Sequence, residues 1–220
     1  SELRAVKVPS NRAAPNEAVI NALDKSSVPP KSISLVVHGT TVAANALLER
    51  RGSKTAFVTT AGFRDVLELG RTTRLVPHTL YNPYFRRPPA LVQRRHRYTI
   101  SERMGSSGTP EISPCLEEIE TLAKEMLKHG IEAVAIGFLN SFRNSMHEKI
   151  AAEIFSQHFE HVTISTDVLN EIREFERFSA AAMNAYLMPI MARYAVALDK
   201  KITKRSSKTS FLTVSSHGGL

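Results

Sequence analysis

Two short polar turns in this sequence each follow an apolar run, and both carry residues suited to binding anions. The first run is Ile33 to Val37, and the second is Phe211 to Val214. The candidate binding residues after them are His38, Gly39, Thr40, Thr41 and Asn45 in one place, and Ser216, Gly218 and Gly219 in the other. Glycines let a backbone approach a ligand, and free N–H groups at a helix start attract phosphate or carboxylate. We therefore expect substrate- or phosphate-binding sites at both turns, although ordinary helix-start chemistry also explains the first.

A dense group of charges opens the last long helical pattern and is the best candidate for catalysis. Its members are Arg173, Glu174, Glu176 and Arg177. Arg173 or Arg177 could hold an anionic group, while Glu174 or Glu176 orients an attacking water. Asn184 lies seven residues after Arg177, two helical turns on, so we expect both to face one cleft. The alternatives are a solvated ion-pair face and a packing asparagine.

Other catalytic patterns are missing from the sequence. It has no Gly-x-Ser-x-Gly nucleophile elbow and no Gly-x-x-x-x-Gly-Lys-Thr phosphate loop. Its histidines lack partners at metal-ligand spacing, so we assign no metal ligand.

Composition indicates a folded protein in a reducing setting. Of 220 residues, only Cys115 is a cysteine, which favours the cytoplasm, and no apolar run reaches the ~20 residues that span a bilayer. The net charge of +8 comes partly from Arg86–Arg87, Arg94–Arg97 and Lys200–Arg205. We expect Arg95 and Arg97 on the wet face of a strand and no nucleic-acid partner, because no aromatic platform accompanies these groups.

The pattern alternates strands and helices, which is typical of the α/β class. We expect strands at 3–8, 33–37, 55–59, 94–101, 133–139, 162–165 and 211–214. We expect helices at 16–23, 41–51, 116–129, 146–159 and 177–205, and an irregular excursion at 75–89.

Several blocks, in this order, carry a family resemblance. They are His38 to Arg50, Val58 to Arg71, Asn170 to Pro189 and Ser215 to Leu220. In these blocks the chain resembles the N-terminal part of the hydantoinase A and 5-oxoprolinase family. Members of that family begin with an Asp-x-Gly-Gly-Thr phosphate loop that this sequence lacks, so we expect an N-terminal fragment.

The resemblance implies a partial actin/sugar-kinase-like ATPase lobe with an inserted α/β region. Its parts would be residues 1–75, an insertion at 76–170, and a returning helix and strand at 171–220. It also implies an ATP-dependent hydrolase of cyclic amides that uses ATP with Mg²⁺, whose ligands lie mostly outside this chain. The expected partners are a small cyclic amide and a second subunit or another copy. The alternatives are the ATP-using subunit of an acetone or acetophenone carboxylase and a noncatalytic assembly module.

Overall fold

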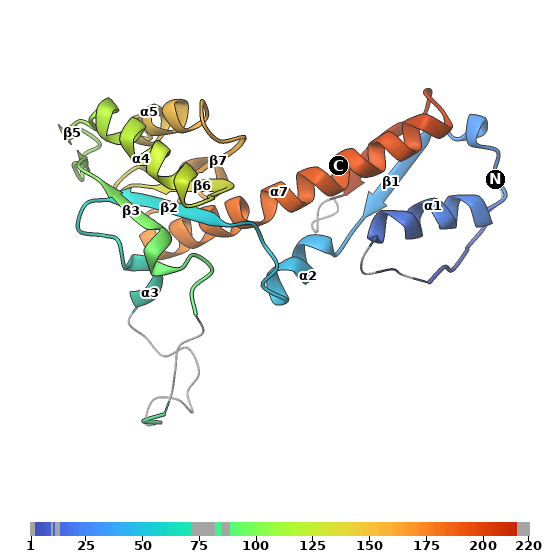
Figure 1. The fold of residues 1–220 in the computed structure, drawn as a ribbon, viewed down its shortest axis with the longest axis horizontal. Coiled ribbons are helices and arrows are strands. Elements are labelled where there is room, and N and C mark those ends of the chain that lie inside the picture. Colours follow the sequence, from blue (N-terminus) through green and yellow to red (C-terminus); the bar gives the residue numbers. More distant parts are fainter. Residues whose placement is uncertain (1–2, 10, 12–13, 72–81, 85–88, 215–220) are drawn as a thin grey trace. The chain divides into compact units, whose positions relative to one another are not determined.

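The computed structural model describes residues 3–9, 11, 14–71, 82–84 and 89–214 (Figure 1). The chain forms two compact units. Unit 1 comprises residues 1–51 and 190–220, and unit 2 comprises residues 52–189. The 32-residue helix α7 (Glu174–Arg205) contributes its first half to unit 2 and its second half to unit 1. The three-part division expected from the sequence stays a prediction.

Unit 2 is built on a four-stranded parallel sheet in the order β3-β2-β6-β7. The strands are β2 (Thr55–Thr60), β3 (Arg97–Ile100), β6 (Ala133–Gly137) and β7 (His161–Ile164). All six residues of β2 and all five of β6 are buried, as expected for central parallel strands covered on both faces.

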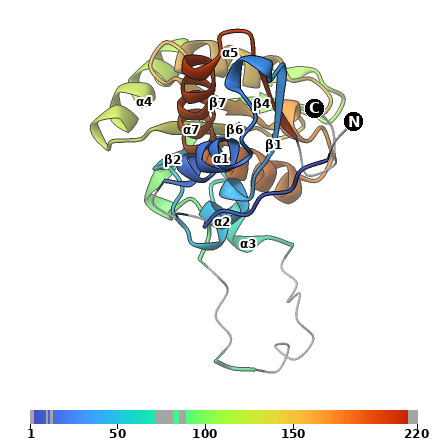
Figure 2. The ribbon, with the colours of Figure 1, turned by 90° about the vertical axis from the view of Figure 1, so that its right-hand side faces the viewer.

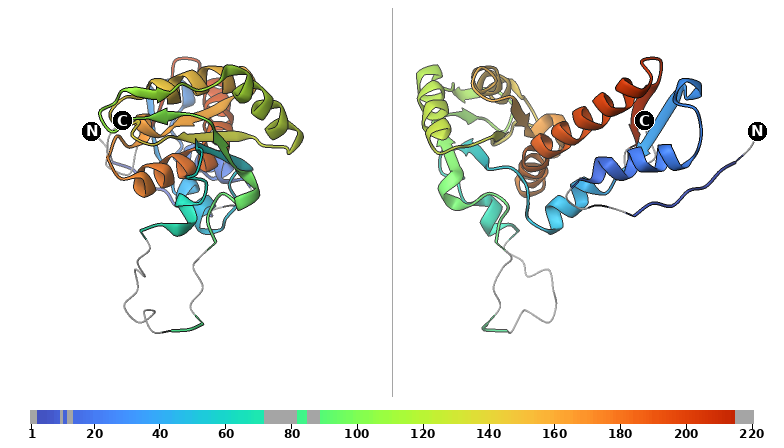
Figure 3. Two further views of the ribbon diagram at one scale, coloured as in Figure 1. Left: turned by 90° about the vertical axis from the view of Figure 1, so that its left-hand side faces the viewer. Right: turned by 45° about the vertical axis from the view of Figure 1, so that its right-hand side comes forward.

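Helices cover both faces of this sheet. Helices α4 (Leu116–Lys128) and α5 (Met146–Phe155) pack on one face, where Val58 and Ile136 meet Met126 and Phe155. The start of α7 packs on the other face, and Figure 3 (left) shows its orange ribbon opposite the yellow-green helices. There a Cβ on Gly137 would lie 2.4 Å from the Phe178 ring, so only glycine allows this approach.

The remaining elements of unit 2 are short. They are α3 (Val66–Leu69), the 3-10 turn η3 (Arg94–His96), β4 (Arg103–Met104), β5 (Pro110–Ile112) and α6 (Ser165–Val168). Strands β4 and β5 form an antiparallel hairpin around the expected turn at 105–108.

Unit 1 joins two helices to a two-stranded parallel sheet (Figure 2). Its elements are α1 (Pro15–Lys25), the 3-10 turn η1 (Pro30–Ser32), β1 (Leu35–Gly39), α2 (Val42–Leu48) and β8 (Ser210–Val214), with the second half of α7. Strand β1 pairs in register with β8, so His38 lies beside Thr213. None of the helices described is long and apolar enough to span a membrane.

The α/β class with parallel strands is confirmed, and several local expectations are wrong. The strand expected from residue 94 begins at Arg97, after the 3-10 turn η3, and the helix expected to residue 159 ends at Phe155. Residues 3–8 form no strand. Helix α2 ends at Leu48, not at residue 51, because Arg50 takes a φ of 52° and Arg51 N–H donates to the Ala46 carbonyl, a Schellman ending. Arg97 is buried at 3% exposure, not wet, because it donates to the Val92 carbonyl and pairs with Glu68. The excursion expected at 75–89 lies largely outside the described residues.

Candidate functional site

The residues predicted at the first turn gather around one cavity of unit 1. This strand-to-turn pocket has a volume of about 960 Å³ and opens where β1 ends. Its lining includes every residue predicted there, namely His38, Gly39, Thr40, Thr41 and Asn45, together with Tyr194 from α7. The volume lies within the usual range for small-molecule pockets, about 300–1,000 Å³.

His38 is the best-anchored side chain of this pocket. Its Nε2 lies 2.7 Å from the Tyr194 hydroxyl, and its ring stacks on Phe211. Desolvation lowers the pKa of His38, which favours the neutral imidazole. One ring nitrogen of a neutral imidazole donates and the other accepts, so the His38–Tyr194 contact provides a fixed polar group without a full charge.

The hydroxyls of the turn are partly engaged in local bonds. Thr40 Oγ1 accepts from the Val42 N–H at 3.2 Å, and Asn45 Nδ2 donates to Thr41 Oγ1 at 3.3 Å. Helix α2 has only seven residues, so its dipole adds little anion attraction. Binding here would therefore depend on side chains: the exposed Thr41 and Asn45 and the His38–Tyr194 pair.

The charged group at the start of α7 lines a different cavity, in unit 2. This carboxyl-edge pocket has a volume of about 570 Å³. Its walls come from the loop after β2, the loop after β6 and the start of α7, and are Phe63, Val66, Gly70, Arg71, Leu139, Arg173, Glu174, Phe175 and Glu176. Parallel α/β sheets bind ligands at this edge, where the carboxyl ends of the strands meet.

Arg177 does not line this cavity. Its side chain is fully buried and donates to the Phe138 carbonyl at 3.0 Å and the Ser165 hydroxyl at 2.8 Å. It also pairs with the buried Glu148 at 3.4 Å, and burial lowers the pKa of Arg177. A solvated ion-pair face, the alternative considered from sequence, is therefore wrong for Arg177. The guanidinium joins α7 to the end of β6.

Two buried polar groups of unit 2, centred on Glu148 and Glu102, could not be identified from the sequence. Glu148 accepts from the Phe138 N–H at 2.9 Å and the Ser141 hydroxyl at 2.7 Å. Glu102 accepts from Thr60 Oγ1, and its other oxygen lies 2.7 Å from His147 Nδ1.

Thr60 connects the second group to the pocket wall. Its hydroxyl accepts the Leu139 N–H at 3.0 Å, and its carbonyl accepts the Phe63 N–H at 3.0 Å. Both Leu139 and Phe63 line the cavity. Leu139 and Glu102 lie 79 and 42 residues from Thr60, so no local pattern could have indicated these two contacts.

Asn184 is the remaining predicted site residue that the structure describes. Asn184 donates to Thr163 Oγ1 at 3.1 Å and lines neither pocket. Ser216, Gly218 and Gly219 lie outside the described residues. Among the residues described, no three His, Cys, Asp or Glu come together as metal ligands.

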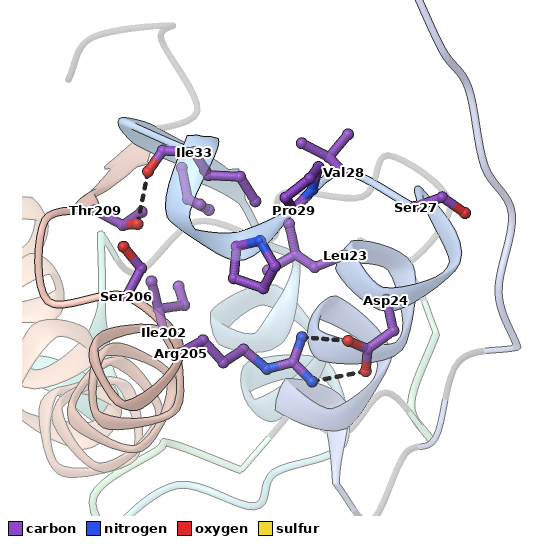
Figure 4. A pocket seen from close by; sticks show the side chains of 12 residues that line it. Leu23, Asp24, Ser27, Val28, Pro29, Ile33, Ile202, Arg205, Ser206 and Thr209 are labelled. Atoms are coloured by element: carbon purple, nitrogen blue, oxygen red, sulfur yellow. Dashed lines mark hydrogen bonds and ion pairs between the residues drawn. The ribbon is translucent and has the colours of Figure 1, made fainter.

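Unit 1 has a further cavity of about 270 Å³ between α1 and the end of α7 (Figure 4). Its lining is mainly aliphatic and includes Leu23, Ile33 and Ile202. Asp24 and Arg205 form a two-bond ion pair at 2.5 and 2.6 Å beside it. No residue predicted from sequence to be functional lies here.

Comparisons with known proteins agree with the resemblance seen in the sequence. The model of the hydantoinase/oxoprolinase N-terminal region matches residues 1–159, and the hydantoinase/oxoprolinase model matches residues 177–220. An uncharacterized protein of Methanocaldococcus jannaschii is 33% identical over 100% of this chain and 32% of its own length. The caprolactamase subunit alpha of Pseudomonas jessenii is 35% identical over 84% of this chain and 27% of its own length.

Two solved structures share the fold. The ATP-dependent caprolactamase from Pseudomonas jessenii has a TM-score of 0.75 and 29% identity over 90% of this chain and 29% of its own. The second is a nucleotide-free acetone carboxylase, an enzyme of ATP-dependent acetone carboxylation. It has a TM-score of 0.81 and 19% identity over 96% of this chain and 32% of its own. The chain thus spans about a third or less of each of these proteins.

Proposed function

Because this chain belongs to the hydantoinase/oxoprolinase family, we propose that it is part of an ATP-dependent hydrolase that opens cyclic amides. The observation that carries this proposal is the similarity to caprolactamase, at 35% sequence identity and with a shared fold. Since the chain spans only part of its relatives, the complete activity belongs to a longer polypeptide or an assembly. A separate subunit is the expected partner, because that relative is itself named as a subunit.

Opening a cyclic amide requires activation of its carbonyl group. An amide carbonyl is a weak electrophile, and resonance protects the ring. ATP with Mg²⁺ would supply a phosphoryl group to the carbonyl oxygen, which makes the carbonyl carbon open to attack by water. The ring C–N bond then breaks with the nitrogen leaving as the amine, and a second water releases phosphate, so that the products are the amino acid, ADP and phosphate. Catalysis then depends on positioning the ring and neutralising charge.

The strand-to-turn pocket is the proposed place for the phosphates. Thr41 and Asn45 are exposed donors on its wall, and the neutral His38–Tyr194 pair adds a fixed polar group. These groups fit phosphate oxygens, which accept hydrogen bonds. Gly39 and Thr40 complete the turn, and Ser216, Gly218 and Gly219 stay predicted contributors.

The start of α7 is the proposed place for ring opening. Arg173 is the cation available to an anionic group, and Glu174 or Glu176 orients the attacking water. Arg177 and the hydrogen-bonded Asn184 position α7 and do not touch the substrate in this proposal.

Ring opening by the longest native polypeptide that contains this sequence tests the proposal. We expect ATP-dependent conversion of a lactam to its amino acid, detected by mass spectrometry, with ADP formed in equal amount. Glu176→Gln should slow turnover about 100-fold or more, the usual scale for a positioned base. Lys149→Ala, an exposed cation on α5, should not change it. No product from lactams, imides or hydantoins would contradict the proposal.

A second candidate is the ATP-using subunit of a ketone carboxylase, which the shared fold with acetone carboxylase favours. The products separate the two, because a carboxylase would form a β-keto acid from the ketone and bicarbonate. A noncatalytic assembly role would instead show partner binding without nucleotide binding.

A further inference from the structure

The carboxyl-edge pocket carries two adjacent, opposite charges without a hydrogen-bonding partner among the residues described. Arg173 is exposed and Glu174 is half-buried, and both line the cavity. The other two charges of the wall, Arg71 and Glu176, form an ion pair with each other. The pocket therefore presents one donor group and one acceptor group from consecutive residues, and the Glu174 carboxylate also attracts the buried Arg177 guanidinium.

The rest of the wall is apolar and firmly held. Phe63, Leu139 and Phe175 supply surface that suits a small ring. The Thr60 hydroxyl and carbonyl fix the backbone of Leu139 and Phe63. A pocket with fixed apolar walls and a few polar groups is the usual form of a specific small-molecule site.

The buried Arg177 network holds the side of the pocket from which the charges project. Its Nε donates to the Glu171 carbonyl at 3.1 Å, and its Nη2 donates to the Phe138 carbonyl at 3.0 Å. These bonds tie the chain just before α7 to the end of β6. Arg173 and Glu174 therefore stand on a supported segment.

A guanidinium and a carboxylate in the wall of one pocket match one kind of neutral ligand. A small lactam is held cis by its ring, so its N–H donor and its C=O acceptor lie on one edge. Arginine only donates hydrogen bonds and an ionised carboxylate only accepts them. We propose that Arg173 binds the carbonyl oxygen and Glu174 binds the ring N–H, so that this pocket is the cyclic-amide site of the chain.

This inference rests on the proposed function and divides the work between the two acidic residues. Glu174 recognises the ring, and Glu176, held by Arg71, is left to orient water. It also places ring recognition in unit 2 and phosphate binding in unit 1. The ligand class is an unsubstituted cyclic amide, since an N-alkyl ring offers no N–H to Glu174.

Equilibrium binding without ATP tests this directly, on the longest native polypeptide. The probes are 2-piperidone and N-methyl-2-piperidone, titrated by calorimetry or ligand-observed NMR. We expect the N–H ring to bind about tenfold more tightly, the scale of one hydrogen bond to a charged group. Arg173→Ala and Glu174→Ala should each weaken it about tenfold, and Glu174→Gln, which keeps an acceptor, should weaken it less.

Matched controls separate this effect from a general loss of charge. Lys149→Ala and Glu153→Gln remove an exposed cation and an exposed carboxylate from α5, and neither should alter binding. Glu174→Ala should leave N-methyl-2-piperidone binding unchanged. No binding of either ring, no preference for the N–H ring, or wild-type affinity in both Arg173→Ala and Glu174→Ala would overturn the inference.

Its failure differs from a failure of the proposed function. Ring opening that proceeds with unchanged KM in the Arg173 and Glu174 variants would keep the hydrolase and reject this site. Selective N–H ring binding without any ATP-dependent opening would keep the site and reject the hydrolase.

Discussion

At the level of single residues, Arg177 is the side chain whose assignment changed most between sequence and structure. The sequence placed it in a charged group with Arg173, as a candidate catalytic residue. The structure surrounds it with the Phe138 and Glu171 carbonyls, two hydroxyls and Glu148. Such a network was invisible in the sequence because Phe138 and Glu148 lie 39 and 29 residues away.

Breaking this buried pair should strongly destabilise the protein. We expect Arg177→Leu to lower the free energy of unfolding by about 3–5 kcal/mol, because it leaves the Glu148 carboxylate buried without its cation. Urea denaturation measures the change. Arg173→Ala, an exposed neighbour, should change stability by less than about 0.5 kcal/mol. Equal effects of the two variants would contradict the buried network.

The close packing at Gly137 predicts the effect of a second single substitution on stability. Because an added Cβ would meet the Phe178 ring at 2.4 Å, Gly137→Ala should push α7 away from the sheet. We expect a loss of about 1–3 kcal/mol in the free energy of unfolding, as in overpacked cores. Gly39→Ala is the control, since no atom lies within 4 Å of its added Cβ. Thermal melts compare the stabilities of the two variants. Equal stabilities would show that the Phe178 ring does not pack this closely on Gly137.

At the level of elements, the sequence pattern predicted correctly those strands whose formation depends on burial alone. The central strands β2 and β6 were predicted because buried parallel strands are continuous apolar runs. Residues 3–8 alternate apolar residues with the charged Arg4 and Lys7 and have no partner strand among the described residues, and a strand exists only through its pairing. Arg97 also depends on tertiary contacts that the local sequence does not show, because it is buried against the Val92 carbonyl and the Glu68 carboxylate.

The Asp24–Arg205 ion pair links α1 to the end of α7 and should make stability depend on pH. The hydrogen bond that Asp24 accepts from Arg205 lowers the pKa of the Asp24 carboxyl below its ordinary value. A carboxyl whose pKa is lowered by folding stabilises the fold above its unfolded pKa, and this contribution is lost as the pH falls through the folded pKa. Asp24→Asn should therefore melt earlier than wild type at pH 7, with the difference vanishing in acid.

The control for that measurement is Asp199→Asn, which removes an exposed carboxylate of α7 that has no described ion pair. Melts from pH 7 down to pH 3 compare the three proteins. A difference between Asp24→Asn and wild type that persists at the lowest pH would show that the link does not depend on charge.

At the level of the whole molecule, three arginines of the basic groups already have acidic partners, while the net charge stays at +8. Arg94 pairs with Asp65, Arg97 with Glu68, and Arg205 with Asp24. These arginines come from the basic groups seen in the sequence. Their ion pairs leave fewer cations to neutralise phosphates.

Nucleic-acid affinity should accordingly be weak. We expect double-stranded DNA to bind no more tightly than ordinary non-specific complexes, about 10⁻⁴–10⁻⁶ M at physiological salt. Fluorescence anisotropy with a labelled duplex gives this value. Nanomolar binding at 150 mM salt would contradict this expectation.

The two pockets lie in different compact units, so variants should separate nucleotide binding from ring binding. Thr41→Val removes the hydroxyl of an exposed donor in unit 1 while keeping its shape, and Arg173→Ala removes a cation in unit 2. We expect Thr41→Val to weaken a fluorescent ATP analogue several-fold and leave 2-piperidone binding unchanged, because one lost hydrogen bond costs about 1 kcal/mol. Arg173→Ala should weaken 2-piperidone binding and leave binding of the ATP analogue unchanged. If Thr41→Val instead weakens the ring and spares the nucleotide, the assignment of phosphates to unit 1 is wrong, even though the family membership stands.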